Sequence, residues 1–126
     1  EYDKAIHYHQ MALEIWQEAY RSNPNHPSIA ASYNGLATAY QEKGEYDQAI
    51  CYYKKSLAIM KETYRSNPNH PSIAASYNNL ALAYDSKGEY DKAIDYHQMA
   101  LAIRQEEYRR KQNHQGRAQV YNKLTK

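Results

Sequence analysis

Three asparagines recur at a fixed spacing of 44 residues, and their side chains are the best candidates for binding in this chain. They are Asn34, Asn78 and Asn122. An asparagine amide is both a hydrogen-bond donor and an acceptor, so a row of them can pair with the backbone of an extended peptide whatever its side chains. The alternative is that they bond to a neighbouring helix and are structural. The spacing alone leaves both alternatives open.

Further positions around these asparagines recur at the same period. Asn79 and Lys123 directly follow the second and third asparagines, and Thr38, Leu82 and Lys126 lie about one helical turn after the three. The full set is Asn34, Thr38, Asn78, Asn79, Leu82, Asn122, Lys123 and Lys126. Lys123 and Lys126, together with Arg117, make one end of the set basic. This favours a protein or peptide ligand that carries acidic residues or a terminal carboxylate.

The histidines and the cysteine give little support for catalysis. His26, His70 and His114 are 44 residues apart, and this spacing favours capping or packing over metal binding. No nucleotide-binding loop, catalytic triad or paired metal-ligand motif occurs in the sequence. We therefore expect no enzyme, no cofactor and no metal site. Cys51, the single cysteine, fits a cytoplasmic protein, and we expect its side chain to be buried or half-buried.

The asparagines belong to a repeat of 44 residues. Residues 1–44 and 45–88 are identical at 30 of 44 positions, and residues 89–126 follow the same frame with more differences. In a repeat array each unit buries its apolar face against its neighbours, so no contacts between distant parts of the chain are needed. We therefore predict one array over residues 1–126, with two complete units and a partial third.

Each unit contains two helices, predicted from apolar residues spaced three and four apart. The one that follows the His-Pro pair is called the A helix here, and the one that follows the glycine is the B helix. Asn25 or His26 is expected to cap the first A helix, with Pro27 in its first turn. Gly44 is the expected stop of that helix. The predicted helices are B at 1–21, A at 27–43, B at 46–65, A at 72–87, B at 90–110 and a truncated A from about 116.

The third copy differs from the others at its loop. Gln112 and Gln115 stand where the second copy has Pro68 and Pro71. Proline removes a backbone donor and disfavours helical geometry in the residue before it, so the loss of both prolines weakens the break. Two outcomes are open here: a weak break before the last A helix, or a helix that runs through the loop.

The motif Tyr33-x2-Leu36-Ala37-x2-Tyr40, followed by Gly44, resembles the tetratricopeptide repeat pattern. The long unit is similar to the repeats of kinesin light chains. This resemblance implies an all-helical, right-handed superhelical solenoid of antiparallel helix pairs. It also implies a scaffold for protein–protein interaction, in which A helices line a concave groove that holds a peptide segment of a partner. The same resemblance places the three asparagines and the periodic positions around them in that groove, so these are the expected peptide-binding residues. The small residues at positions such as Ala37 let the helices approach closely.

Two other functions remain as alternatives. The chain starts with a B helix and ends with an A helix, so both ends expose apolar faces that favour self-association into a homo-oligomer or a swapped dimer. The residues expected there are Trp16, Tyr20, Val120, Tyr121 and Leu124. RNA binding at the basic C-terminal end is less favoured, because most of the 15 tyrosines fall on the predicted core stripe. No apolar run is long enough to span a membrane.

Overall fold

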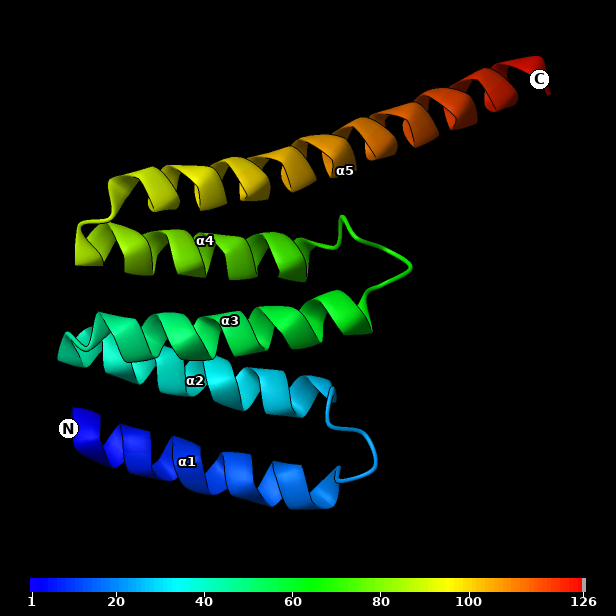
Figure 1. The fold of residues 1–126 in the computed structure, drawn as a ribbon. Coiled ribbons are helices and arrows are strands. Elements are labelled where there is room, and N and C mark those ends of the chain that lie inside the picture. Colours follow the sequence, from blue (N-terminus) through cyan, green and yellow to red (C-terminus); the bar gives the residue numbers. More distant parts are fainter. Residues whose placement is uncertain (126) are drawn as a thin grey trace.

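The computed structural model describes residues 1–125, which form a stack of five helices. Successive helices lie side by side and antiparallel, and the stack grows in chain order from α1 to α5 (Figure 1). All of the extensive contacts join helices that are neighbours in the sequence. The described residues therefore form the all-helical solenoid that the repeat predicts. The helices are α1 (Tyr2–Ala19), α2 (Pro27–Lys43), α3 (Tyr46–Thr63), α4 (Pro71–Lys87) and α5 (Tyr90–Leu124).

The two proline-containing loops end in histidine caps. Pro71 occupies the first turn of α4, and Nδ1 of His70 accepts a hydrogen bond from the backbone N–H of Ser72 at 3.0 Å. The His70 ring also stacks on Tyr64, with ring centroids 3.6 Å apart. His26 caps α2 in the same way. Of the two residues expected at the first cap, Asn25 and His26, the structure has His26, and the cap gives both loop histidines a structural role.

We predict that His70→Ala lowers the free energy of unfolding by about 1 to 2 kcal/mol, because the cap and the ring stack are both lost. Urea unfolding followed by circular dichroism measures the change. His70→Asn is the matched control, because asparagine is a good capping residue but has no ring. It should recover part of the loss. Equal losses in the two variants would show that the cap contributes nothing.

A repeated ion-pair bridge closes each A-to-B connection. In the second copy the Lys87 ammonium lies 2.6 Å from Asp47 of α3 and 3.3 Å from Glu89. Its hydrogen bond to Asp47 raises the pKa of Lys87, so the ammonium stays charged over the neutral range. Just beyond each A helix lies a glycine with positive φ, Gly44 at 90° and Gly88 at 92°, a conformation that other residues rarely adopt. The turns between the A and B helices are therefore stabilised both by the backbone conformation of the glycines and by the lysine ion pairs.

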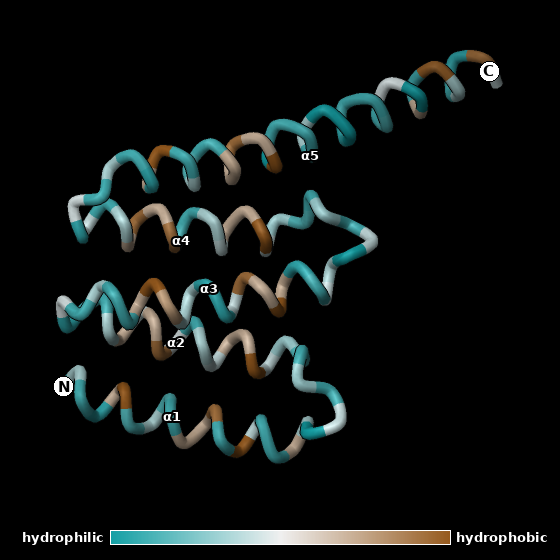
Figure 2. Tube along the Cα trace, in the orientation of Figure 1, coloured by the Kyte–Doolittle hydropathy of each residue, from teal (hydrophilic) through white to brown (hydrophobic). Residues whose placement is uncertain are grey.

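The core lies between the layers and contains alanines, leucines and tyrosines. Ala37, Ala49 and Leu80 are fully buried, and this confirms the expected close approach of the helices. Tyr52 of α3 stacks on two tyrosines of α2, with ring centroids 5.9 Å from Tyr33 and 5.7 Å from Tyr40. Figure 2 shows hydrophobic positions recurring at intervals along α1 to α4. Most of the tyrosine side-chain surface in the first two copies is thus buried in packing contacts.

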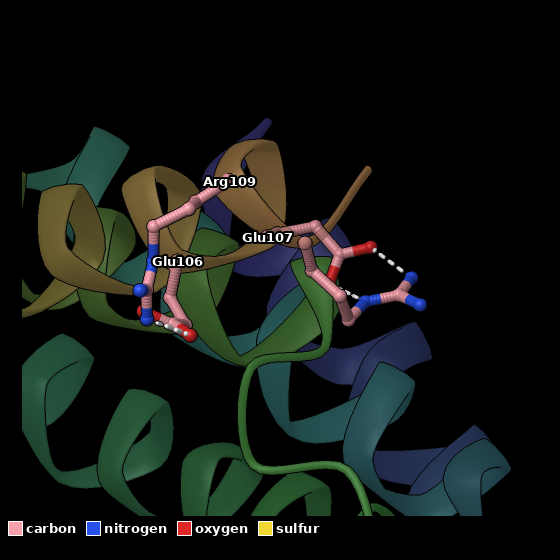
Figure 3. A network of polar contacts seen from close by, with 4 residues as sticks. Glu106, Glu107 and Arg109 are labelled. Carbon is pink, nitrogen blue, oxygen red and sulfur yellow. Dashed lines mark hydrogen bonds and ion pairs between the residues drawn. The ribbon is translucent and has the colours of Figure 1, made fainter. Parts of the chain in front are cut away.

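Among the described residues, the third copy forms one helix in place of two. α5 runs unbroken from Tyr90 to Leu124, so the expected truncated A helix from about residue 116 is not formed, and the alternative of a helix running through the loop is what the structure has. Two local ion pairs cross this region, Glu106–Arg109 at 2.7 Å and Glu107–Arg110 at 2.8 Å (Figure 3). Ion pairs at this spacing support a helix. The hydrogen bond from Arg110 also lowers the pKa of Glu107.

Residues 111–124, called the α5 tail here, extend beyond the other four helices (Figure 1). The Glu107–Arg110 pair is new in this copy, since the equivalent positions in the second copy are Thr63 and Ser66. The unbroken helix therefore has two causes: the missing prolines and the added ion pair.

Two further observations concern the rest of the chain. Cys51 is exposed, so the expectation of a buried or half-buried side chain is wrong. It follows buried Ile50 by one residue, and one residue turns about 100° around a helix, so Cys51 faces away from the core. No helix among residues 1–125 is both long and apolar enough to cross a membrane.

Candidate functional site

A surface groove lies between the two A helices, α2 and α4, and its floor is formed by α3. We call it the α2–α4 groove. It has a volume of about 430 Å³. Its lining residues are Thr38, Gln41, Glu42, Tyr46, Tyr53, Asn79, Leu82 and Ser86. Three of the residues expected from the sequence, Thr38, Asn79 and Leu82, are thus brought together.

Tyr53 of α3 forms the floor of the groove. Its hydroxyl lies 3.1 Å from Oγ1 of Thr38, and only 5% of its surface is exposed. Burial raises the pKa of Tyr53, so its hydroxyl is neutral at physiological pH. A neutral hydroxyl can donate one hydrogen bond and accept another. Tyr53 therefore holds Thr38 in place and gives the groove a rigid base.

Sequence reasoning missed part of the groove lining. Gln41 and Glu42 lie three and four residues after Thr38, and this spacing places them on the same side of α2. This spacing from Thr38 could have identified Gln41 and Glu42 from the sequence alone. Tyr46 and Tyr53 come from a different helix, so their presence depends on how α3 packs between α2 and α4.

Asn34 of α2 and Asn78 of α4, the first two of the three periodic asparagines, have different surroundings. Nδ1 of His97 lies 3.3 Å from one amide heteroatom of Asn78. With its amide oxygen turned to the other side, Asn78 accepts hydrogen bonds from the Arg104 guanidinium at 2.8 and 3.1 Å. The structural alternative therefore applies to Asn78, which is linked to α5. Oδ1 of Asn34 is shielded from solvent and has no hydrogen-bond partner among the described residues.

The remaining expected binding residues lie elsewhere. Asn122 and Lys123 are on the α5 tail, outside the α2–α4 groove, because the third A helix does not form. Lys126 lies outside the described residues. Arg117 is also on the tail. Among the described groove-lining residues Glu42 is the only one with a charged side chain, so Arg117 and Lys123 do not contribute to this surface.

The residues expected for self-association are mostly exposed. Val120, Tyr121 and Leu124 are exposed on the α5 tail, where the last turns carry hydrophobic residues with no helix beside them (Figure 2). Trp16 is exposed at the end of α1. Tyr20 instead stacks on His26, with ring centroids 3.5 Å apart, so it belongs to the first loop. No group of three or more potential metal ligands lies together within residues 1–125.

The comparisons with known proteins agree with this architecture. The tetratricopeptide repeat family profile matches residues 1–62 and 62–106. A similar solved structure is described as a Podosopora anserina putative kinesin light chain with nearly identical TPR-like repeats. It has 33% identity and a TM-score of 0.69, and the match covers 81% of this chain and 46% of that chain. The matched part is thus about half of that protein.

A second solved structure has a more similar length. It is the TPR domain of Arabidopsis FLU, with 28% identity and a TM-score of 0.66, and the match covers 81% of this chain and 79% of that domain. A Q17M form of the Podosopora anserina protein matches at 32% identity with a TM-score of 0.69. No curated protein matches the chain.

Proposed function

Because the chain belongs to the tetratricopeptide repeat family, we propose that it binds an extended peptide segment of a partner protein in the α2–α4 groove. The family and the fold indicate a protein–protein interaction scaffold. The groove is the observation that carries the finer proposal, because it gathers polar and apolar side chains from both A helices over a rigid floor.

The lining suggests how such a peptide would be held. Asn79, Gln41 and Ser86 offer side-chain donors and acceptors to a peptide backbone. Leu82 is exposed and offers an apolar contact to one ligand side chain. These groups lie on helices rather than on flexible loops, so little conformational entropy of the protein is lost on binding.

The charges give the ligand a preferred direction. Glu42 disfavours an acidic residue at its end of the groove. Arg104 lies beside Asn78, at the side where α4 meets α5. We propose that an acidic residue of the ligand pairs with Arg104, in place of the cations that are on the α5 tail.

A screen of the chain against an array of ten-residue peptides, repeated with variants, tests this proposal. Binding should fall at least tenfold in Asn79→Ala combined with Leu82→Glu, because a hydrogen-bonding group is lost and a charge enters the apolar contact. Gln98→Ala, at an exposed position of α5 outside the groove, is the control and should bind as the unchanged chain does. Equal binding in the groove variant would place the peptide site elsewhere. Arg104→Gln should weaken only the acidic peptides.

We propose self-association as a second function, and a specific observation supports it. The apolar residues Val120 and Leu124 are exposed on a helix that projects from the body. Exposed apolar residues grouped on one surface are typical of interaction sites. Light scattering of the purified chain at increasing concentration tests this second proposal, and a strict monomer would contradict it.

A further inference from the structure

A second hollow lies where α3, α4 and α5 meet, beside the loop that joins α3 to α4. We call it the α3–α5 pocket, and its volume is about 510 Å³. Sites for small molecules typically have volumes of about 300 to 1,000 Å³. The apolar and aromatic side chains of its walls include Tyr64, Ile73, Tyr77, Met99, Ala102 and Ile103. The pocket thus has the size and the lining of a site for a small, largely apolar ligand.

The α3–α5 pocket and the α2–α4 groove open on opposite sides of α4. Tyr77 lines the pocket, and Ser86 lines the groove. These two residues are nine positions apart, which at about 100° per residue is two and a half turns of the helix. Ile73 of the pocket and Leu82 of the groove have the same separation. Occupancy of the pocket is therefore independent of the proposed peptide binding.

The walls of the pocket are held in place by contacts within the chain. Ile73 is buried in the core, with 3% of its surface exposed. Tyr64 stacks on His70, the residue that caps α4. The described lining contains no asparagine, glutamine, serine or threonine, in contrast to the α2–α4 groove. Few groups can therefore pair with a peptide backbone, and the walls suit a ligand whose body is hydrocarbon.

Two cations stand at the rim of the pocket. Lys61 comes from the last turn of α3, and Arg65 comes from just beyond the end of that helix. The Lys61 ammonium lies 5.4 Å from the centroid of the Tyr77 ring. A carboxylate placed at this rim can form charge-assisted hydrogen bonds with both side chains.

The carboxylates next to the rim are already paired. Glu62 lies 3.3 Å from Arg65, but this pair is exposed and therefore weak, so Arg65 can turn to a ligand. Glu106 follows Ile103 on the same side of α5, and both of its oxygens accept hydrogen bonds from Arg109 at 2.7 Å (Figure 3). No acidic residue is among the described lining residues. The rim is thus positive.

The first copy differs at the position that opens this pocket. Lys55 stands where the third copy has Met99. The Lys55 ammonium lies 5.6 Å from the ring centroid of Tyr33 and 5.3 Å from that of Tyr52. Tyr33 is the counterpart of Tyr77. The exchange of lysine for methionine therefore places an apolar wall beside Tyr77, where the first copy has a charge.

We propose that the α3–α5 pocket binds a carboxylate with an unbranched hydrocarbon chain of about eight to ten carbons. The chain lies against Tyr77 and Ile103, and the carboxylate pairs with Lys61 and Arg65. The tail of a second copy does not fit this site, because residues 111–124 carry four basic residues or histidine and no acidic residue, so like charges would meet at the rim.

The methionine methyl groups give the readout for the test. Met99 lines the pocket, whereas Met11, its counterpart in the first copy, lies on α1 with nearly the same exposure, 45% against 47%. We expect sodium decanoate, kept below its micelle concentration, to shift the Met99 methyl resonance in two-dimensional NMR and to leave that of Met11 unchanged. No shift at Met99, or equal shifts at both methyl groups, would overturn the proposal.

The chain length and the charge of the probe test the two parts of the site. From hexanoate to octanoate to decanoate, the Kd should fall about fourfold for each CH₂ group that is buried. 1-Octanol has the chain of octanoate without its charge, and it should bind at least tenfold more weakly. Equal affinities for these two would overturn carboxylate recognition. A ten-residue peptide that shifts Met99 where decanoate does not would reassign the pocket to a protein partner.

The repeat supplies matched variants. Ala102 is exposed on the pocket wall, and Ala58 is its exposed counterpart on α3. Ala102→Phe should fill the pocket and abolish decanoate binding, whereas Ala58→Phe should bind as the unchanged chain does. Arg65→Gln should weaken binding about fivefold. Arg21→Gln should have no effect, although Arg21 pairs with Glu18 as Arg65 does with Glu62.

Circular dichroism of the four variants checks that they are folded, and unchanged spectra are expected because all four positions are exposed. Decanoate binding that is unchanged in Ala102→Phe would overturn the proposed site. Equal weakening in Arg65→Gln and Arg21→Gln would show a general effect of net charge and would overturn the proposed pairing at the rim.

Discussion

Leu80→Ala is expected to lower the free energy of unfolding by about 2 to 5 kcal/mol. Leu80 is completely buried in a cluster that includes Ile50, Leu57 and Ile73, so its removal leaves a cavity between α3 and α4. The stability of a three-unit array is small, and this loss is a large part of it. Urea unfolding followed by far-ultraviolet circular dichroism gives the change.

Leu82→Ala is the matched control for this prediction. Leu82 lies two residues further along α4 and is exposed, so its truncation should change the stability by less than about 0.5 kcal/mol. If both variants lost equal stability, then the core would not be centred on Leu80 as the structure shows.

Tyr53→Ala is expected to cost about 3 to 5 kcal/mol, because Tyr53 is buried between α3 and its two neighbouring A helices. Tyr53→Phe keeps the ring and loses only the contact with Thr38, so its cost should be about 0.5 to 1.5 kcal/mol. The same unfolding experiment measures both variants.

The repeat itself supplies a third substitution at this position. His9 and His97 are the equivalents of Tyr53, so Tyr53→His is compatible with the fold and should cost less than Tyr53→Ala. A Tyr53→Phe variant as unstable as Tyr53→Ala would show that the hydroxyl, rather than the ring, contributes most of the stability.

The helices and both complete loops could be predicted from the sequence, because local signals determine them. Pro71 and His70 begin α4, and Gly88 ends it, through effects that act within a few residues. The alternatives at the third loop could not be separated in the same way. There the outcome depends on the sum of several small terms, including the Glu107–Arg110 pair.

The candidate site was only partly predictable for a related reason. Thr38, Asn79 and Leu82 were expected in the groove because the resemblance to the tetratricopeptide pattern places these positions of α2 and α4 there, and the structure brings the three side chains to one surface. Most tyrosines were predicted to lie on the core stripe, and the additional place of Tyr53 in the groove lining depends on the position of α3. Asn122 and Lys123 were expected beside the others, but that expectation assumed a third A helix.

The order of contacts in this stack has a consequence for how the chain folds. Every extensive contact joins helices that follow one another in the sequence, so no long loop has to be closed before favourable contacts form. Folding can start at any of the hairpins and spread to either side, and rapid folding is expected. Helices α2, α3 and α4 are each supported by a neighbouring helix on both sides, so opening one of them breaks contacts with two neighbours.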